Sequence, residues 1–551
     1  MFSSKKMKYL AVTAIILAVC SLFASCTAQN TANTSTELNL SRFIKFPGTE
    51  PSSVDPQVIS ENFTVPINIF DRLVENAVSE DGKTAIAPSL AKSWNVSDDG
   101  LEYTFYLREG VYFSNGSMLE ADDVLFTFTR LISNPDSKNR DLVMCIHGAD
   151  ALKNGETSKL EGFEIIDDLT FKITLNHPYA AFLEALTSPA ASILDRTVTT
   201  DAGDDFGKLP GMTAGTGPFI LNKWASNREI VMVANENYWG GAPKCEGLRM
   251  MFYSESDPLR TMFLDGELDI LDLDKLGMDA EYFIRGDIYR KNLVKGDRVG
   301  ITFIALNQSV EPLDDVRVRK ALQTSLDRKT ILRAAAEGKG YIENGILPHS
   351  LKGYDPDLEE IPFDVEAAKA LLAEAGYAGG FDLDLYYSDT SSGSDKDILE
   401  LASSMWSKIG VRATVRELPA AEFNEMKKAG KLSCYVGSWN ANYNDPDDFV
   451  YTFFGNADNS LSNSLCYYDE DVFERAHHAR AILNEDERLE EYRDLQKKIV
   501  VEDAAWIPLF SKLHFYVVSG KVGGFSMSWN GWSSVKFTGT YFIDGEKVIR
   551  Q

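Results

Sequence analysis

The chain has 551 residues and a formal net charge of −27 at pH 7, with a sequence pI near 4.7. This length is sufficient for several hydrophobic cores. The acidic balance argues against nucleic-acid binding, which requires a basic surface, and we interpret it as a contribution to solubility alone.

The N-terminus is predicted to be an export signal over residues 1–25. A basic region ends at Lys8, and the apolar run 9–19 is too short to span a bilayer. Residues 22–26, ending in Ala-Ser-Cys, resemble a bacterial lipobox, although Phe23 replaces the usual aliphatic residue. The resemblance implies lipidation of Cys26, a flexible polar tether over 26–37 and anchoring on the extracytoplasmic face, at the cell surface or in the periplasm. The alternative is ordinary cleavage with Cys26 as a bystander.

Residues 88–130 predict a hairpin-rich unit that leads into one helix. A turn at 98–100 precedes alternating apolar and polar residues over 101–107, which is the pattern of a strand with one buried face. Asn115-Gly116 is a second turn signal. Apolar residues then recur at helical spacing over 121–132.

Helices and strands alternate in the C-terminal half. Asp364 is expected to cap a helix that Gly376 ends, and a second apolar helical stripe over 398–409 stops at Gly410. A strand is predicted over 411–418, and Asn484 is placed to cap a later helix. This alternation predicts an α/β architecture.

Sequence motifs typical of enzymes are absent. The sequence contains no Gly-x-Ser-x-Gly, His-Glu-x-x-His, Walker or dinucleotide-binding motif. His477 and His478 are adjacent, and neighbouring helical residues point about 100° apart, so a solvated surface is favoured over a metal site. We therefore expect no catalytic residues, no metal and no cofactor. Among the cysteines after the signal, Cys434 and Cys466 are the least implausible disulfide pair.

Several short stretches resemble landmarks of one family, and they occur in the family's order. They are EPSSVDP at 50–56, the whole of 88–130, GTGPF at 215–219, NYW at 237–239, DVRVRKAL at 315–322 with DR at 327–328, LLAEAGY at 371–377 and NDPDDF at 444–449. Together they closely resemble the family 5 extracellular solute-binding proteins, the peptide-binding subunits of bacterial ABC importers.

The resemblance implies a fold and a division into domains. The fold is an α/β periplasmic-binding-protein fold of type II, with two lobes that close on a ligand in a cleft and an extra inserted domain. Domain I would comprise 38–79, 210–298 and 508–551. Domain II, the insertion, would comprise 80–209, and domain III would comprise 299–507.

The resemblance also implies a binding site centred on the segment 438–446, SWNANYNDP, which follows a predicted strand over 432–436. In peptide receptors the strand edge binds an extended peptide main chain, which is β-augmentation. The expected site residues are Glu50, Ser52, Ser438, Trp439, Asn440, Asn442, Tyr443 and Asp445. For Trp439 and Tyr443, burial in the core is the alternative.

One position departs from the peptide-binding pattern. Asn442 matches the position at which peptide receptors carry an aspartate that pairs with the α-ammonium group of the peptide. A neutral amide would form a bond about half as strong as a charge-assisted one. Three explanations remain open: Asp445 supplies the charge, the ligand lacks a free α-amine, or the ligand is not a peptide.

The expected function is that of a lipid-anchored, monomeric receptor that closes around a peptide or peptide-like solute and delivers it to the permease subunits of an ABC importer. A receptor of the same family for a metal chelate, a glycoside or an opine-like solute is the first alternative. A secreted enzyme on the same scaffold is the second, and no catalytic motif supports it.

Overall fold

The computed structural model describes residues 38–60, 62–78, 84–254, 258–391, 393–530 and 535–543. The predicted signal, Cys26 and the tether lie outside these residues. The chain divides into two compact units, at Met1–Arg42 and Phe43–Gln551. Within the described part of the first unit, Leu40–Arg42 form a single 3-10 turn, η1. In the described residues, no helix has the length and apolar character needed to cross a membrane.

The second unit begins with a four-stranded sheet in the order β1-β10-β9-β8. Its strands are β1 (Phe43–Gly48), β10 (Gly247–Phe252), β9 (Glu229–Ala234) and β8 (Phe219–Ala225). β1 runs parallel to β10, and the other pairs are antiparallel. The buried face of this sheet packs on the C-terminal segment, where the rings of Phe46 and Phe537 stack at 5.1 Å.

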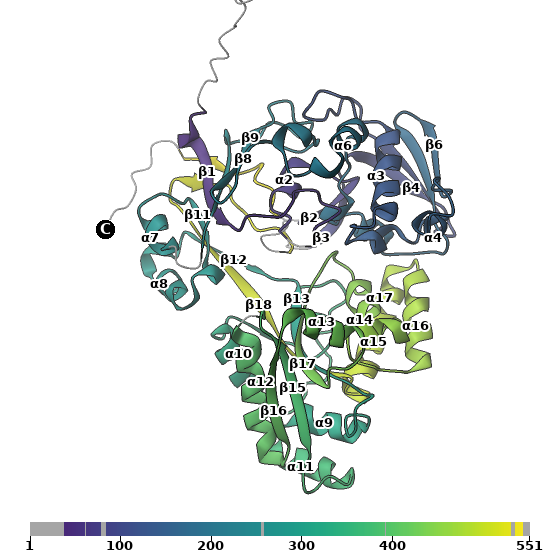
Figure 1. The fold of residues 1–551 in the computed structure, drawn as a ribbon, viewed down its shortest axis with the longest axis vertical. Helices are drawn as coiled ribbons and strands as arrows, with labels where there is room; N and C mark the ends of the chain where they lie inside the picture. The colour runs from purple at the N-terminus through teal and green to yellow at the C-terminus, as the bar shows by residue number, and fades with distance from the viewer. Residues whose placement is uncertain are drawn as a thin grey trace, which may run out of the picture. The chain divides into compact units, whose positions relative to one another are not determined.

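The inserted domain carries a four-stranded antiparallel sheet in the order β4-β5-β7-β6 (Figure 1). The strands are β4 (Ala91–Val96), β5 (Glu102–Leu107), β7 (Thr170–Thr174) and β6 (Phe163–Asp167). The alternation predicted for 101–107 is confirmed, because Tyr103, Phe105 and Leu107 are buried. The predicted helix is α3 (Ala121–Ser133), which begins with a capping box formed by Glu120 and Asp123.

Residues 299–507, which we expect to form the second lobe, contribute five strands of an eight-stranded sheet whose main order is β11-β18-β13-β17-β15-β16. The strands from this lobe are β13 (Gly300–Leu306), β14 (Gly340–Ile342), β15 (Asp382–Ser388), β16 (Arg412–Leu418) and β17 (Cys434–Asn440). β11 (Ile270–Asp272) and β12 (Leu293–Asp297) pair with the far end of β18.

The helix signals of the C-terminal half are confirmed. Asp364 caps α11 (Val365–Glu374) by accepting from the backbone N–H groups of the first turn. α12 (Gly393–Trp406) continues into a 3-10 turn that ends at Gly410, whose φ is +90°. Asn484 caps α17 (Glu485–Gln496).

The remaining helices and strands connect these sheets. The helices are α2 (Pro66–Ile69), α4 (Ala149–Lys153), α5 (Phe182–Ala185), α6 (Arg196–Ala202), α7 (Leu259–Leu264), α8 (Glu281–Ile284), α9 (Val316–Thr324), α10 (Arg328–Ala336), α13 (Ala420–Lys428), α14 (Asp447–Phe454), α15 (Ala457–Ser462) and α16 (Glu470–Ala481), and the strands are β2 (Val74–Val78), β3 (Thr84–Pro88), β19 (Val522–Gly523) and β20 (Tyr541–Phe542).

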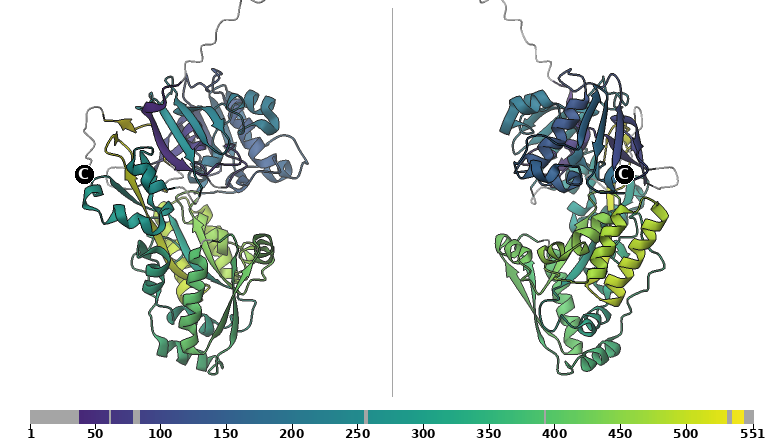
Figure 2. Two further views of the ribbon diagram at one scale, coloured as in Figure 1. Left: turned by 60° about the vertical axis from the view of Figure 1, so that its left-hand side comes forward. Right: turned by 90° about the vertical axis from the view of Figure 1, so that its right-hand side faces the viewer.

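One long strand, β18, pairs both with the strands of the second lobe and with β11 and β12. β18 (Trp506–Val518) is 13 residues long, and it can be followed as the long yellow strand in Figures 1 and 2. Its first half pairs with β13 and β14 of the second lobe, and its second half pairs with β11 and β12. The domain boundary expected at 507/508 therefore falls inside a continuous strand.

The cysteines in the described residues are all free. Cys145, Cys245 and Cys434 are buried and Cys466 is half-buried, and none forms a disulfide. The pairing of Cys434 with Cys466 considered from the sequence is therefore wrong for this structure. His477 and His478 are both exposed on α16, as the surface interpretation predicts.

Candidate functional site

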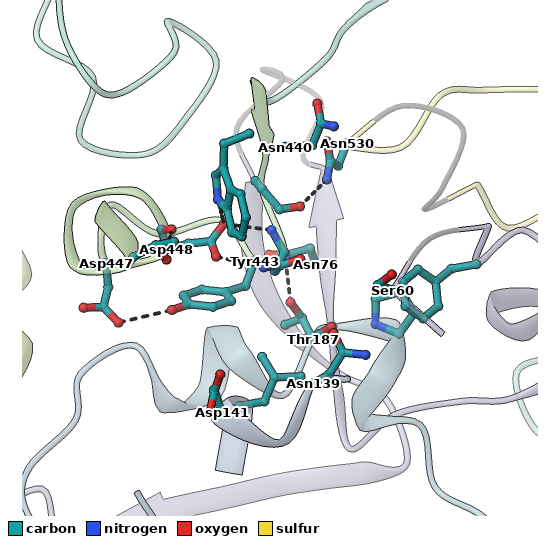
Figure 3. Close-up of a pocket in the computed structure, with 18 of the residues that line it drawn as sticks. Ser60, Asn76, Asn139, Asp141, Thr187, Asn440, Tyr443, Asp447, Asp448 and Asn530 are labelled. Atoms are coloured by element: carbon teal, nitrogen blue, oxygen red, sulfur yellow. Dashed lines mark hydrogen bonds between the residues drawn. The ribbon is translucent and has the colours of Figure 1, made fainter. Parts of the chain in front are cut away.

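A cavity of about 1250 Å³ is lined by residues of the segment 60–76, the inserted domain, Arg298, the second lobe and the C-terminal segment. It is larger than the roughly 300–1,000 Å³ typical of small-molecule sites. Figure 3 shows Asp447 and Asp448 at the left of the cavity, Ser60 at the right and Asn139 below. Most of its walls are polar or aromatic side chains, so it can form hydrogen bonds with a solute of considerable size.

Five of the eight expected site residues line this cavity. They are Ser438, Trp439, Asn440, Asn442 and Tyr443. The strand expected to end at Val436 continues to Asn440, because residues 434–440 of β17 pair fully with β13. The first part of the expected binding loop is therefore a strand edge.

One edge of that strand end has no strand partner among the described residues. β17 pairs with β13 from Cys434 to Asn440, but it pairs with β15 only at Tyr435. The edge of residues 437–440 that faces away from β13 therefore has no neighbouring strand to pair with among the described residues. An unpaired edge of this kind offers backbone donors and acceptors to an extended ligand.

The other three expected residues do not line the cavity. Glu50 accepts hydrogen bonds from Trp224 Nε1 at 2.9 Å and from the backbone N–H of Asn227 at 2.8 Å. It therefore ties its own loop to the end of the β8–β9 hairpin. Ser52 is exposed and also lies outside the lining.

Asp445 is fully buried and held by a cation of the second lobe. Its two carboxylate oxygens accept from Arg488 at 2.7 and 2.6 Å, and Oδ1 also accepts from the backbone N–H of Asp447. This bidentate pair satisfies the carboxylate. Of the three explanations left open for Asn442, the pair with Arg488 argues against the one in which Asp445 supplies a charge to the ligand.

Asp447 joins the inserted domain to the second lobe at the edge of the cavity. Its carboxylate accepts from Tyr179 at 2.7 Å, from Tyr443 at 3.1 Å and from Tyr492 at 3.3 Å. Arg480 lies 3.1 Å from Oδ1 and neutralises the charge. Tyr443 thus lines the cavity and is also part of a buried cluster.

Asp448 lines the cavity and is held only by neutral donors. Oδ2 accepts from the Asn442 N–H at 2.8 Å and from Trp439 Nε1 at 3.2 Å, and Oδ1 accepts from Asn442 Nδ2 at 3.1 Å. Among the described residues, no cation lies within ion-pair distance of it. Burial raises the pKa of Asp448 to about 7, although these hydrogen bonds act in the opposite direction.

Cationic side chains also line the cavity. Lys536 is paired with Asp71 at 2.7 Å and with Glu75 at 3.0 Å. The side chains of Arg298 and Lys138 make no hydrogen bond or ion pair within the part of the chain that the structure describes. Arg298 lies between β12 and β13, where the chain enters the second lobe. These two groups are available for an anionic part of a ligand.

The sequence analysis did not identify Asp448 or Arg298. Two consecutive aspartates after Pro446 look like acidic residues in the first turn of a helix, which is their ordinary structural role. The only signal was their position directly after the aromatic and amide-rich segment. An isolated arginine between two strands carries no comparable signal.

A second polar cluster lies outside the cavity. Ligand-type atoms of Asp272, Asp274 and His514 lie within 4.8 Å of one another. Burial lowers the pKa of His514 to about 4, and the nearby charges of Arg298 and Lys512 act in the same direction. Because those positive charges also oppose a bound cation, we assign no metal to this cluster.

Comparison with known proteins identifies the family. Residues 85–460 match the model of the bacterial extracellular solute-binding proteins, family 5. The chain belongs to this family. It is 30% identical over 544 residues to heme-binding protein A of Haemophilus influenzae, covering 94% of this chain and 96% of that one. It is also 30% identical over 493 residues to di/tripeptide-binding protein 2 of Pseudomonas aeruginosa, covering 87% and 91%.

A solved structure supports the fold directly. HbpA2 from Haemophilus parasuis superposes with a TM-score of 0.76 at 26% identity, covering 91% of this chain and 99% of that one. The resemblance noted from the sequence and the expected fold class are thereby confirmed. This member of family 5 is an extracellular solute-binding protein, and the role of the family is binding rather than catalysis.

Proposed function

We propose that this solute-binding protein captures peptides or peptide-like solutes for an ABC importer, and that the cavity described above is its binding site. The observation that carries the proposal is the unpaired edge of β17 at Ser438–Asn440, which borders the cavity. An extended peptide can add to such an edge through main-chain hydrogen bonds, which do not depend on its side chains.

The charges around the cavity suit a zwitterion. Arg298 and Lys138 are free to bind a carboxylate. The cavity is also lined by carboxylates of the second lobe, which carry the opposite charge. Several relatives bear names that state dipeptide or di/tripeptide binding. These observations together favour a peptide with free termini over an uncharged solute.

A second candidate is a non-peptide solute of similar size. The relative from Haemophilus influenzae is named for heme binding. Asn442 offers no charge at the position where the family's peptide receptors carry one, and the cavity volume of about 1250 Å³ leaves room for a larger ligand. Both candidates use the same cavity.

The N-terminus would hold the protein at the membrane surface. We propose that Cys26 is lipidated and that the protein acts as a monomer, tethered on the extracytoplasmic face beside its permease. The resemblance of residues 22–26 to a lipobox supports this part of the proposal.

The test is to incubate the purified protein with an equimolar mixture of di- and tripeptides and to identify the retained molecules by mass spectrometry. We expect retained peptides, and we expect methylation of one backbone nitrogen in a retained peptide to weaken binding by about tenfold or more, the cost of a lost hydrogen bond. Retention of no peptide, with heme raising the melting temperature, would favour the second candidate.

A further inference from the structure

Three aspartates follow one another closely at the start of α14, and they differ in their partners. Asp445 is paired with Arg488 at 2.6 Å, and Asp447 is paired with Arg480 at 3.1 Å. Asp448 has no such cation among the described residues. All three are buried, so solvent does not compensate the third charge.

The hydrogen bonds of Asp448, which lines the cavity, leave one acceptor position of its carboxylate unused. A carboxylate can accept about four hydrogen bonds, and Asp448 accepts three, two of them at Oδ2. Asn442 donates its Nδ2 to Oδ1, while its own Oδ1 has no hydrogen-bond partner within the described residues. Asn442 is exposed and lines the cavity beside Asp448. The two side chains thus present a charged and a neutral oxygen at one place.

The other carboxylates of the cavity are less suited than Asp448 to bind a positively charged group of a solute. Asp447 and Glu75 are already paired with Arg480 and Lys536. Asp141 is exposed and therefore solvated, so pairing it with a ligand would bring little net gain. Figure 3 shows Asp141 at a different part of the cavity from Asp448.

We propose that Asp448 supplies the negative charge that binds an ammonium group of the solute, with the amide oxygen of Asn442 as a second acceptor. The charge that peptide receptors of this family carry at the position of Asn442 is thus provided from a neighbouring position. The inference rests on the proposed function, and it makes Asp448 the residue that selects for a free amine.

The burial of Asp448 gives a physical reason for this role. An unpaired buried carboxylate is unfavourable, and a bound ammonium group would relieve that cost while forming a bond stronger than one between neutral groups. The charged groups that face Asp448 are Asp447 and, through it, Arg480. The unfavourable free energy of burying the Asp448 carboxylate is thus offset only when the solute is bound.

The test compares free and N-acetylated tripeptides in an equimolar mixture. Wild-type protein is expected to retain the free peptides at least tenfold better. Asp448→Asn should reduce this preference by about tenfold, so that free and acetylated peptides are retained nearly equally, since a hydrogen bond to a charged group is lost. Asp141→Asn, a cavity variant of the same chemistry, should keep the preference. The double variant Asn442→Asp with Asp448→Asn should restore it, because the charge moves to the neighbouring position.

The outcomes separate this inference from the proposed function. Peptides retained without preference for a free amine, or an unchanged preference in Asp448→Asn, would overturn the role of Asp448 and leave the peptide receptor intact. Retention of no peptide would overturn both. If Asp448→Asn does not fold, the wild-type affinity for free peptides is measured at pH 7.5 and pH 6. Protonation of Asp448 should weaken it roughly five- to tenfold, and an unchanged affinity would overturn the inference.

Discussion

Tyr179 of the inserted domain donates a hydrogen bond of 2.7 Å to Oδ2 of Asp447 in the second lobe. Beside it, the Ala180 N–H donates to the carbonyl oxygen of Arg480 at 2.8 Å, and the Arg480 guanidinium lies 4.5 Å from the centre of the Tyr179 ring. The inserted domain thus contacts the second lobe through a buried polar cluster at one edge of the cavity.

Tyr179→Phe should destabilise the protein by about 1–2 kcal/mol, because the ring remains while a buried carboxylate loses one donor. Urea unfolding followed by circular dichroism measures this change. Tyr112→Phe is the control, since Tyr112 is 50% exposed, and its effect should stay within about 0.5 kcal/mol. Equal effects of the two variants would show that the hydrogen bond to Asp447 contributes nothing measurable.

Arg488→Met should be strongly destabilising, by about 3–5 kcal/mol, because it leaves the buried carboxylate of Asp445 without its cation. Adding Asp445→Asn should recover part of that loss, since no charge is then left unpaired. Arg317→Met is the matched control: its pair with Asp315 is exposed, and the expected cost is at most about 1 kcal/mol. The three free energies of unfolding come from denaturant titration, and a double variant no better than Arg488→Met contradicts the prediction.

His349 makes stability depend on pH. Burial alone would lower its pKa, but hydrogen bonds to Asp297 and Glu343 and the charges of these groups raise the pKa of His349 to about 9. Because this value lies above the unfolded value of about 6.5, the stabilisation is complete below pH 6.5 and is lost as the pH rises through 9. The expected loss is on the order of 2–3 kcal/mol.

The comparison is between wild type and His349→Gln at pH 6 and pH 9.5. Other groups that titrate in this range contribute equally to both proteins, so the difference isolates His349. The wild type should lose more stability between the two pH values than the variant. Parallel stability curves would mean that the ion pairs of His349 do not persist in solution.

Arg298→Gln should weaken the binding of peptides with a free C-terminal carboxylate by about 1.5–3 kcal/mol, while the binding of their C-terminal amides changes little. Lys295→Gln is the control, because Lys295 lies on β12 three residues earlier and does not line the cavity. Isothermal titration calorimetry with a peptide and its amide measures the difference. An equal loss of affinity for the peptide and its amide would show that Arg298 does not bind the C-terminal carboxylate.

Cys26→Ala should release the protein from the membrane fraction, because it removes the atom that would carry the lipid. Cys20→Ala, inside the predicted signal, should leave the protein anchored. Fractionation followed by immunoblotting distinguishes the two, and a Cys26→Ala variant that stays with membranes would contradict lipid anchoring.

Local patterns in the sequence predicted many of the elements that build the fold. The alternation over 101–107 and the caps at Asp364 and Asn484 act within a few residues, so they can be recognised without knowing the tertiary structure. The arginines that pair with Asp445 and Asp447 could not be predicted, because α17 and α16 bring them back to the site from later in the chain. The same applies to β18, whose two halves pair with strands more than 150 residues earlier.

The position of β18 near the end of the chain has a consequence for how the protein is made. We expect neither half of the large sheet to be complete until residues 506–518 have been synthesised, because strands of both halves pair with this strand. The inserted domain, by contrast, has all four of its sheet strands between Ala91 and Thr174 and can form early. Ser526–Asn530 and Lys536, which follow this strand, also line the cavity, so we expect the binding site to be the last part of the fold to form.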